Sequence, residues 1–308
     1  MSPRLVLSAL LGCTFVIAAS APLKPANAQA WVPLQGEGQV TTTYENLYVR
    51  YHLDYTGKRF DAGPIRTHTV ITTLEYGLTN KLALDSELIH VTSKYEGFVG
   101  PVPHGPPDTG FYHPTFQDLR IGLRYNVLAS NKLVVTPFVA TVIPTHHYET
   151  KGHTAVGRDL RELQIGVNLG RDLGDVIPRT YVEGRYYYAM VQNVQQFGLN
   201  RSSADWEFGY FASPKLSVRF TGAWQHTYSG VRFPLDSGIP DFHELHDRAA
   251  KSAYLRFGGG LSVSLTRSVD LHADFGNTFR GASTHQSRGL SLGLSWRFSR
   301  GGFRVGKF

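Results

Sequence analysis

The stretch that decides the fold is DLRIGLRYN, residues 118–126. Every second residue in it is apolar, and the residues between are charged, polar or glycine. The segment GLSLGLSWRF, residues 289–298, repeats this pattern. A period of two places alternate side chains on opposite faces of an extended chain, so both stretches predict β-strands with one apolar and one polar face.

The same alternation recurs along the chain in about twelve segments of on the order of ten residues, the length that a tilted strand needs to cross a bilayer. The predicted strands are 38–53, 65–77, 81–95, 115–127, 132–145, 160–171, 179–191, 203–212, 215–228, 252–265, 268–280 and 287–298.

The connections between these strands alternate in length. The short ones are rich in Gly, Asn, Ser and Pro, as turns are, and comprise 77–80, 128–131, 172–178, 213–214 and 266–267. The longer ones are 54–64, 96–114, 146–159, 192–202, 229–251 and 281–286. This asymmetry predicts an all-β fold, a transmembrane antiparallel up-and-down β-barrel of about twelve strands with long extracellular loops and short periplasmic turns. An even number of strands places both ends of the barrel at the periplasm.

Composition narrows the protein class. The chain has 308 residues, 42% of them hydrophobic, with 32 Gly, 16 Tyr and 18 Phe. Its mean hydropathy of -0.20 excludes a bundle of membrane helices, and its aromatic content excludes disorder. The net charge is +7, and without the two cations of the N-terminal segment, Arg4 and Lys24, the excess of +5 is spread along the chain, so no nucleic-acid partner is expected.

A soluble β-sandwich or lipocalin-like barrel is the main alternative fold. Two features weigh against it: the face opposite the apolar one is charged and rich in Gly and Ser, and aromatic residues recur near the periplasmic strand ends. Such aromatic girdles are typical of membrane barrels. The aromatic residues are Tyr76, Tyr125, Tyr210, Trp296 and Phe298.

Residues 1–28 are predicted to be a secretory signal, with cleavage after Ala28 or Ala30. A single membrane anchor, or a lipoprotein signal ending at Cys13, is the alternative. Cys13 is the only cysteine, so cleavage leaves no thiol in the mature chain. Export by the Sec route and a location in the outer membrane of a Gram-negative bacterium follow as expectations.

The remaining chain is divided into a periplasmic lead-in (29–37), the barrel (38–298) and a basic tail (299–308). An aromatic residue ends the last strand at Phe298 and the tail at Phe308, and either could be the one that the barrel assembly machinery reads. The other expected partners are outer-membrane lipid, lipopolysaccharide and a small-molecule solute.

If the apolar faces contact lipid, the polar faces line the lumen, where charges of both signs must be paired or hydrated. They could set the selectivity of a narrow aqueous path, or form a salt-bridged plug that holds the barrel in shape. The candidate lumen-lining residues are Glu75, Asp85, Glu87, Asp118, Arg120, Arg124, Glu162, Glu183, Arg185, Glu207, Arg219, Arg256, Asp270, His272, Asp274 and Arg297.

We expect no enzymatic activity, no cofactor and no metal. The densest group of histidines is DFHELHD, residues 241–247, whose H-x-x-H spacing would place two imidazoles on one face of a short helix. It lacks the glutamate placement of a zincin motif. The G-x-S-x-G pattern at residues 289–293 lies inside the predicted strand 287–298 and not at a strand-to-helix turn, so no nucleophile elbow is expected. An enzyme acting on lipid or lipopolysaccharide, and a structural or adhesive barrel whose loops 96–114 and 229–251 bind partners, are the alternatives to a channel.

Three segments carry a resemblance to a known family: YGLTNKL (76–82), FQDLRIGLRY (116–125) and IPT (143–145). The chain resembles, over residues 36–298, the bacterial outer-membrane "transporter" family described as the MetA pathway of phenol degradation. His146 and Gln117 stand where that family often has glycine. The resemblance implies passage of small, often aromatic or hydrophobic, compounds and supplies no functional residues.

Overall fold

The computed structural model describes residues 29–98, 105–130, 132–240 and 242–299, except for the side chains of His243 and Glu244. The predicted signal segment with Cys13, the loop residue His104 and the tail beyond Ser299, with its Phe308, lie outside the described residues.

The described chain is almost entirely β-structure. Its strands are β1 (Glu37–Leu53), β2 (Arg59–Gly77), β3 (Leu82–Tyr95), β4 (His113–Tyr125), β5 (Leu128–Ala129), β6 (Val134–Pro144), β7 (Glu162–Asp172), β8 (Thr180–Val191), β9 (Arg201–Ser213), β10 (Leu216–Thr227), β11 (Ala253–Ser264), β12 (Val269–Ala282) and β13 (Thr284–Ser299), and its helix is α1 (Phe242–Ala249).

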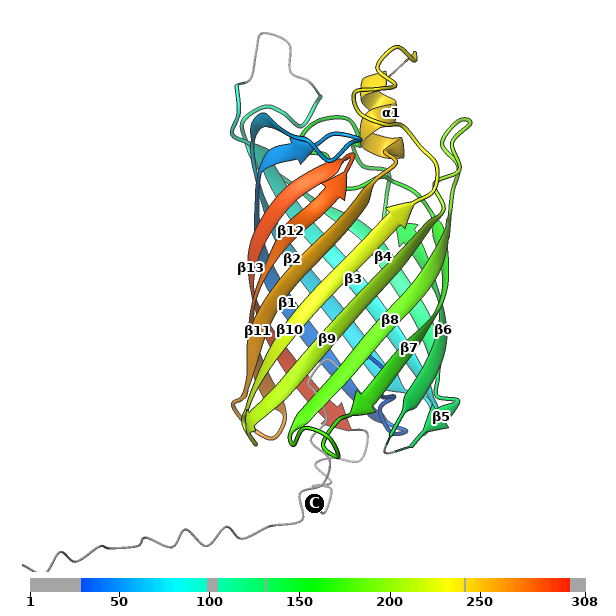
Figure 1. Cartoon of the computed structure of the whole chain (residues 1–308), viewed down its shortest axis with the longest axis vertical. Helices are drawn as coiled ribbons and strands as arrows, with labels where there is room; N and C mark the ends of the chain where they lie inside the picture. The colour runs from blue at the N-terminus through cyan, green and yellow to red at the C-terminus, as the bar shows by residue number, and fades with distance from the viewer. Residues whose placement is uncertain (1–28, 99–104, 131, 241, 300–308) are drawn as a thin grey trace, which may run out of the picture.

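The strands close into one barrel. Each long strand pairs antiparallel with the next long strand along the chain, and β13 pairs with β1 to complete the ring. The two-residue β5 pairs only with β6, so the described barrel has the twelve long strands that the alternation predicts. Figure 1 shows the tilted strands, with α1 and the long loops at one end and the short turns at the other. We call these the long-loop end and the short-turn end.

Two connections at the long-loop end are shorter than predicted. The expected loop 54–64 is only a turn over 54–58, because Asp54 Oδ1 accepts hydrogen bonds from the Thr56 and Lys58 backbone N–H groups at 2.8 and 2.9 Å. The expected loop 281–286 is the single residue Ser283, which has a φ of 45°. A bulge at Arg50 interrupts the alternation of β1 nearby. Because of the local turn and the bulge, the observed β2 begins six residues before the predicted strand 65–77.

The two faces of the wall differ as the sequence pattern predicts. On β13 the outward Leu290 and Trp296 are 65% and 53% exposed, whereas the inward Ser295 is fully buried. Tyr125 and Tyr210 are also exposed near the short-turn end. The apolar side chains therefore form the outer surface of the barrel, and the polar ones fill its interior.

The long-loop end has a small apolar core of its own. Leu245 and Phe242 of α1 pack with residues of three loops and of β8, and Leu199 and Val231 in it are completely buried. This core holds α1 against the rim (Figure 1). Within the described ranges, no helix has the length and apolar character needed to span a membrane.

Candidate functional site in the barrel interior

Near the short-turn end, β2, β3 and β4 bring four of the predicted charges together. Arg124 is 3.3 Å from Glu75 and 3.5 Å from Asp85, and Arg120 forms an ion pair with Asp85. All four point inward, and Arg124 is 3% exposed. Because two arginines and two carboxylates neutralise one another, this cluster holds three neighbouring strands together.

The segment that precedes β1 lies inside the short-turn half of the barrel. Arg124 Nη1 donates to the Gln29 carbonyl at 2.6 Å, and the buried Thr136 hydroxyl donates to the Ala30 carbonyl at 2.6 Å. Trp31 lies over Gly170, where a Cβ atom would come within 2.7 Å of the indole ring. The lead-in is thus packed against the interior wall, and its contacts cross from β4 through β6 to β7.

On the opposite wall, Arg219 of β10 is the centre of a second cluster. Its Nη2 atom contacts both carboxylate oxygens of Asp274, at 2.5 and 2.6 Å, and its Nε atom lies 3.7 Å from Glu207. Tyr181 donates to Glu207, and Arg219 also donates to Ser262. Asp270 and Arg297 form a separate ion pair at 3.0 Å.

His272 lies between two serines in this wall. Its Nδ1 atom is 2.8 Å from Ser262 Oγ and its Nε2 atom is 2.7 Å from Ser295 Oγ, which in turn contacts Thr41 at 2.6 Å. A serine beside a histidine is the start of a nucleophilic site. Here both ring nitrogens bond to hydroxyls, so no carboxylate orients the imidazole, and Ser295 is fully buried. The arrangement therefore joins β1, β11, β12 and β13 and offers no nucleophile to a substrate.

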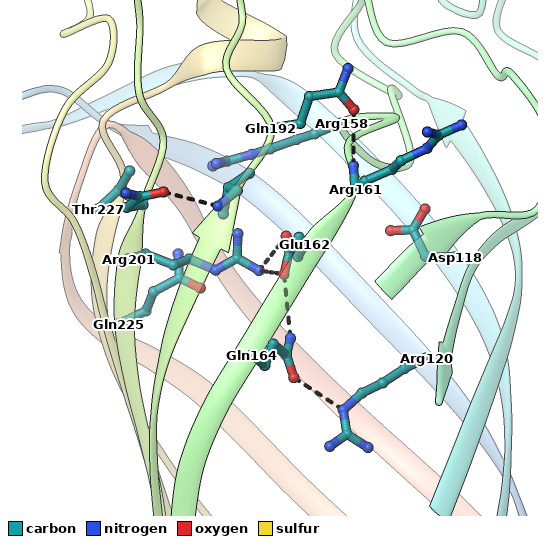
Figure 2. Close-up of polar contacts among 12 residues, drawn as sticks. Asp118, Arg120, Arg158, Arg161, Glu162, Gln164, Gln192, Arg201, Gln225 and Thr227 are labelled. Carbon is teal, nitrogen blue, oxygen red and sulfur yellow. Dashed lines mark hydrogen bonds and ion pairs between the residues drawn. The ribbon is translucent and has the colours of Figure 1, made fainter. Parts of the chain in front are cut away.

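A third cluster lies nearer the long-loop end (Figure 2). Arg201 at the start of β9 binds Glu162 at the start of β7, with N–O distances of 2.6 and 2.7 Å. Gln164 donates to Glu162 at 3.3 Å and accepts from Arg120 at 3.1 Å. This chain of contacts connects the third cluster to the first along the inner wall.

Loop 145–161 extends two side chains into the same region. Tyr148 donates to Asp118 Oδ1 at 2.7 Å, and burial together with this bond raises the pKa of the Tyr148 phenol, which keeps it a neutral donor. Arg158 donates to Ser252 at 2.9 Å. Among the described residues no partner lies at its Nη1 atom. Figure 2 shows Arg158 above the Glu162–Arg201 pair.

Four of the predicted interior charges lack an ion-pair partner among the described residues. Within the described ranges, Glu87, Glu183, Arg185 and Arg256 form no ion pair at 4 Å or less. Glu183 accepts a hydrogen bond from the Ala30 backbone, and no partner among the described residues lies at its Oε2 atom. Arg185 lies 4.4 Å from the Phe138 ring centroid and 5.0 Å from that of Tyr187, and its Nη1 atom donates to Gln29 at 3.2 Å.

These four residues line two cavities inside the barrel. One of about 300 Å³ is bounded by Glu183, Arg185 and Arg256, and one of about 230 Å³ by Glu87 and again Arg185. Gln29 borders both cavities, so the lead-in segment lies between them. Cavities that are lined by unpaired charges are the part of the interior that a solute could contact.

The predicted lumen residues therefore divide by their contacts. Those with an ion-pair or hydrogen-bond partner on another element are Glu75, Asp85, Asp118, Arg120, Arg124, Glu162, Glu207, Arg219, Asp270, His272, Asp274 and Arg297. Arg201 and Gln164 are not among the predicted lumen residues, although Gln164 lies between the outward Leu163 and Ile165 and is inward by alternation. Gln29 is also not among them, because no sequence pattern indicates that the segment before β1 lies inside the barrel.

The histidine-rich segment shows no metal centre in the part of the chain that is described, which contains no group of three His, Cys, Asp or Glu side chains arranged to hold an ion. His246 of α1 instead contacts its neighbour Asp247 at 2.8 Å and packs beside Phe233. The side chain of His243 lies outside the described residues.

A closed barrel with an apolar outer wall and a charged interior defines the fold of outer-membrane β-barrels, and solved structures agree. An outer-membrane channel from Pseudomonas putida F1 is 14% identical, with a TM-score of 0.66 over 90% of this chain and 100% of that one. The translocator domain of the autotransporter NalP from Neisseria meningitidis is 12% identical, with a TM-score of 0.52 over 86% and 90%.

These likenesses establish the fold, which one of these proteins uses as a channel and the other as a translocator. No family model matches the sequence, and no curated protein matches it significantly. The family resemblance of the three short motifs therefore stays a prediction.

Proposed function

We propose that this chain is an outer-membrane channel that passes small solutes between the outside of a Gram-negative cell and its periplasm. The long-loop end faces outward and the short-turn end faces the periplasm, as in outer-membrane barrels generally. The observation that carries the proposal is the pair of interior cavities lined by Glu87, Glu183, Arg185 and Arg256. Unpaired charges inside an apolar wall are costly unless they serve water or a solute.

The chemistry of the cavities favours small solutes that combine a ring with a charge. Arg185 sits between the aromatic rings of Phe138 and Tyr187, which is a surface that can stack a planar molecule and bind a carboxylate. The carboxylates of Glu87 and Glu183 would hold an amine or keep a second acid away. Small aromatic acids are therefore the solutes that we propose, in line with the family resemblance.

Electrical recording and solute flux test the channel. The full mature chain, refolded and inserted into planar bilayers, should give discrete conductance steps, and proteoliposomes should admit benzoate faster than glucose. Arg185→Gln should slow benzoate entry, while Arg171→Gln, at the exposed end of β7, should not. Absence of both conductance and flux in the wild-type protein would exclude a channel.

The cellular location and export route are part of the proposal. Residues 1–28 supply a signal for Sec-type export, and the exposed apolar wall requires a lipid environment. Cell fractionation should find the mature protein with the outer membrane, and its band should shift in electrophoresis upon heating, as closed barrels do. Recovery in a soluble periplasmic fraction would contradict this location.

We propose no enzymatic activity for the barrel. The Ser262–His272–Ser295 arrangement is the closest approach to a nucleophilic site among the described residues, and it is buried. Unchanged lipid and lipopolysaccharide profiles after overexpression are the expected result.

A further inference from the structure

The outer wall at the long-loop end carries a patch of positive charge that the channel does not use. Strand pairing aligns Tyr48 of β1 with Arg66 of β2 and Arg288 of β13 in one row. Tyr48 and the exposed Tyr44 are both on β1 and are separated by an even number of positions, so they lie on the same face of the strand. These side chains therefore point away from the lumen. We call the surface formed by Arg50, Arg59, Arg66, Lys94 and Arg288, with the tyrosines between them, the outer basic patch.

The cations of this patch lie mainly on aromatic rings. Arg59 is 4.4 Å from the centroid of Tyr51, and Arg288 and Arg66 are 5.0 and 5.4 Å from that of Tyr48. A tyrosine ring keeps a guanidinium in place over its face and leaves its N–H donors free.

Carboxylates neutralise only part of the patch. Asp61 pairs with Arg50 at 3.0 Å, and Glu96 pairs with Arg66 at 3.4 Å and Lys94 at 3.9 Å. In the described chain no carboxylate lies within 4 Å of Arg59 or Arg288. Five cations face two anions, so the patch has an excess of positive charge.

A groove runs through the patch and continues onto apolar wall. It has a volume of about 500 Å³ and is lined by Tyr48, Tyr51, Arg50, Arg59, Arg288, Gln286, Asn277 and Phe275. Phe275 is 51% exposed, and its register partner Leu290 is 65% exposed. The groove thus joins guanidinium and amide donors at its upper part to an apolar surface below them.

We propose that the outer basic patch binds the phosphorylated headgroup of lipopolysaccharide, with its acyl chains lying on the wall around Phe275 and Leu290. Arg59 and Arg288 would donate to one phosphate from the two sides of the groove, since the planar guanidinium suits bidentate contact with phosphate. This inference rests on the orientation given under the proposed function, which brings the patch to the outer leaflet.

Charge and position select this lipid among others. The ligand must be anionic, because no carboxylate of the described chain pairs with Arg59 or Arg288. It must also carry acyl chains, because the groove opens onto apolar wall. The outer leaflet at the long-loop end is where a phosphorylated glycolipid with several acyl chains is found. Gln286 and Asn277 add amide groups that can bond sugar hydroxyls.

The test measures binding of a defined lipid to the intact barrel. Delipidated full-length mature protein in neutral detergent is titrated with bisphosphorylated lipid A and monitored by native mass spectrometry. Arg59→Gln with Arg288→Gln should weaken binding at least about tenfold, since each removes charge-assisted hydrogen bonds. The matched control, Lys215→Gln with Arg267→Gln, removes two charges from turns at the short-turn end and should bind as the wild type does.

Three results would overturn the proposal: equal affinity of the wild-type and Arg59/Arg288 variants, an equal loss in the control, or equal affinity for phosphatidylglycerol and lipid A. All four substituted side chains lie on the outer surface, and an unchanged heat-shift in electrophoresis confirms that the variants fold. The variants should keep wild-type conductance in phosphatidylcholine bilayers. Lipid A binding by a barrel without conductance would reject the channel and retain the lipid site.

Discussion

The arginines on the two faces of the barrel wall have different partners. Inside, Arg219 and Arg124 are at most 9% exposed, and each contacts two carboxylates. Outside, Arg59 and Arg288 are exposed and lie on tyrosine rings without a carboxylate. Because a buried charge must be compensated within the protein whereas an exposed one need not be, the inner arginines stabilise the barrel and the outer ones remain available to a ligand.

Arg185 does not follow this division. It faces inward like Arg219, yet it has rings as neighbours like Arg59, and it borders both cavities. The kind of partner that an interior residue contacts therefore distinguishes positions that hold the barrel together from positions that face a solute. Variants on either side of this division can test it.

The largest effect is expected from Arg219→Met. It would leave Asp274 and Glu207 without their cation in the interior, which should lower the free energy of unfolding by about 3 kcal/mol. Urea unfolding of the barrel in lipid vesicles measures this change.

The Arg219 variant has an internal control. Adding Asp274→Asn to Arg219→Met removes one of the uncompensated carboxylates and should restore part of the loss. A loss below about 1 kcal/mol for Arg219→Met alone would indicate that water, and not the ion pair, solvates these groups.

A second effect should follow from replacing residues 29–34 with Gly and Ser at equal length. The variant would lose Trp31 and the side chain of Gln29, which borders both cavities, and single-channel conductance should rise by about twofold as the constriction widens. Planar-bilayer recording measures it. Unchanged conductance would show that the solute path does not pass this segment.

Reversing one unpaired interior charge should have a smaller effect. Arg185→Glu replaces the cation that borders both cavities with a carboxylate, beside Glu87, Glu183 and Asp205, so the ratio of cation to anion permeability should rise by about two- to threefold. The reversal potential in a salt gradient measures this ratio. Arg171→Glu, which alters an exposed pair with Asp175, should leave it unchanged.

The sequence alone predicts most of the fold, because alternation is a local property of each strand. It yields twelve strands, the polar inner face and the two classes of connection. It cannot show which inner charges are paired. Glu162 and Glu183 look alike in sequence, but among the described residues Arg201 of β9 pairs with Glu162 and no cation pairs with Glu183. The connections at Asp54 and Ser283 are shorter than the alternation predicts, because a bulge at Arg50 interrupts the alternation of β1 beside them.

The smallest effect on stability is expected on the outer face, from Arg59→Gln with Arg288→Gln in vesicles without lipopolysaccharide. Only two exposed cation–π contacts are lost, so the free energy of unfolding should fall by no more than about 1 kcal/mol. The same urea unfolding experiment measures it beside Arg219→Met. A loss as large as that of Arg219→Met would mean that the outer arginines also hold the wall together, and the contrast between the two faces would not stand.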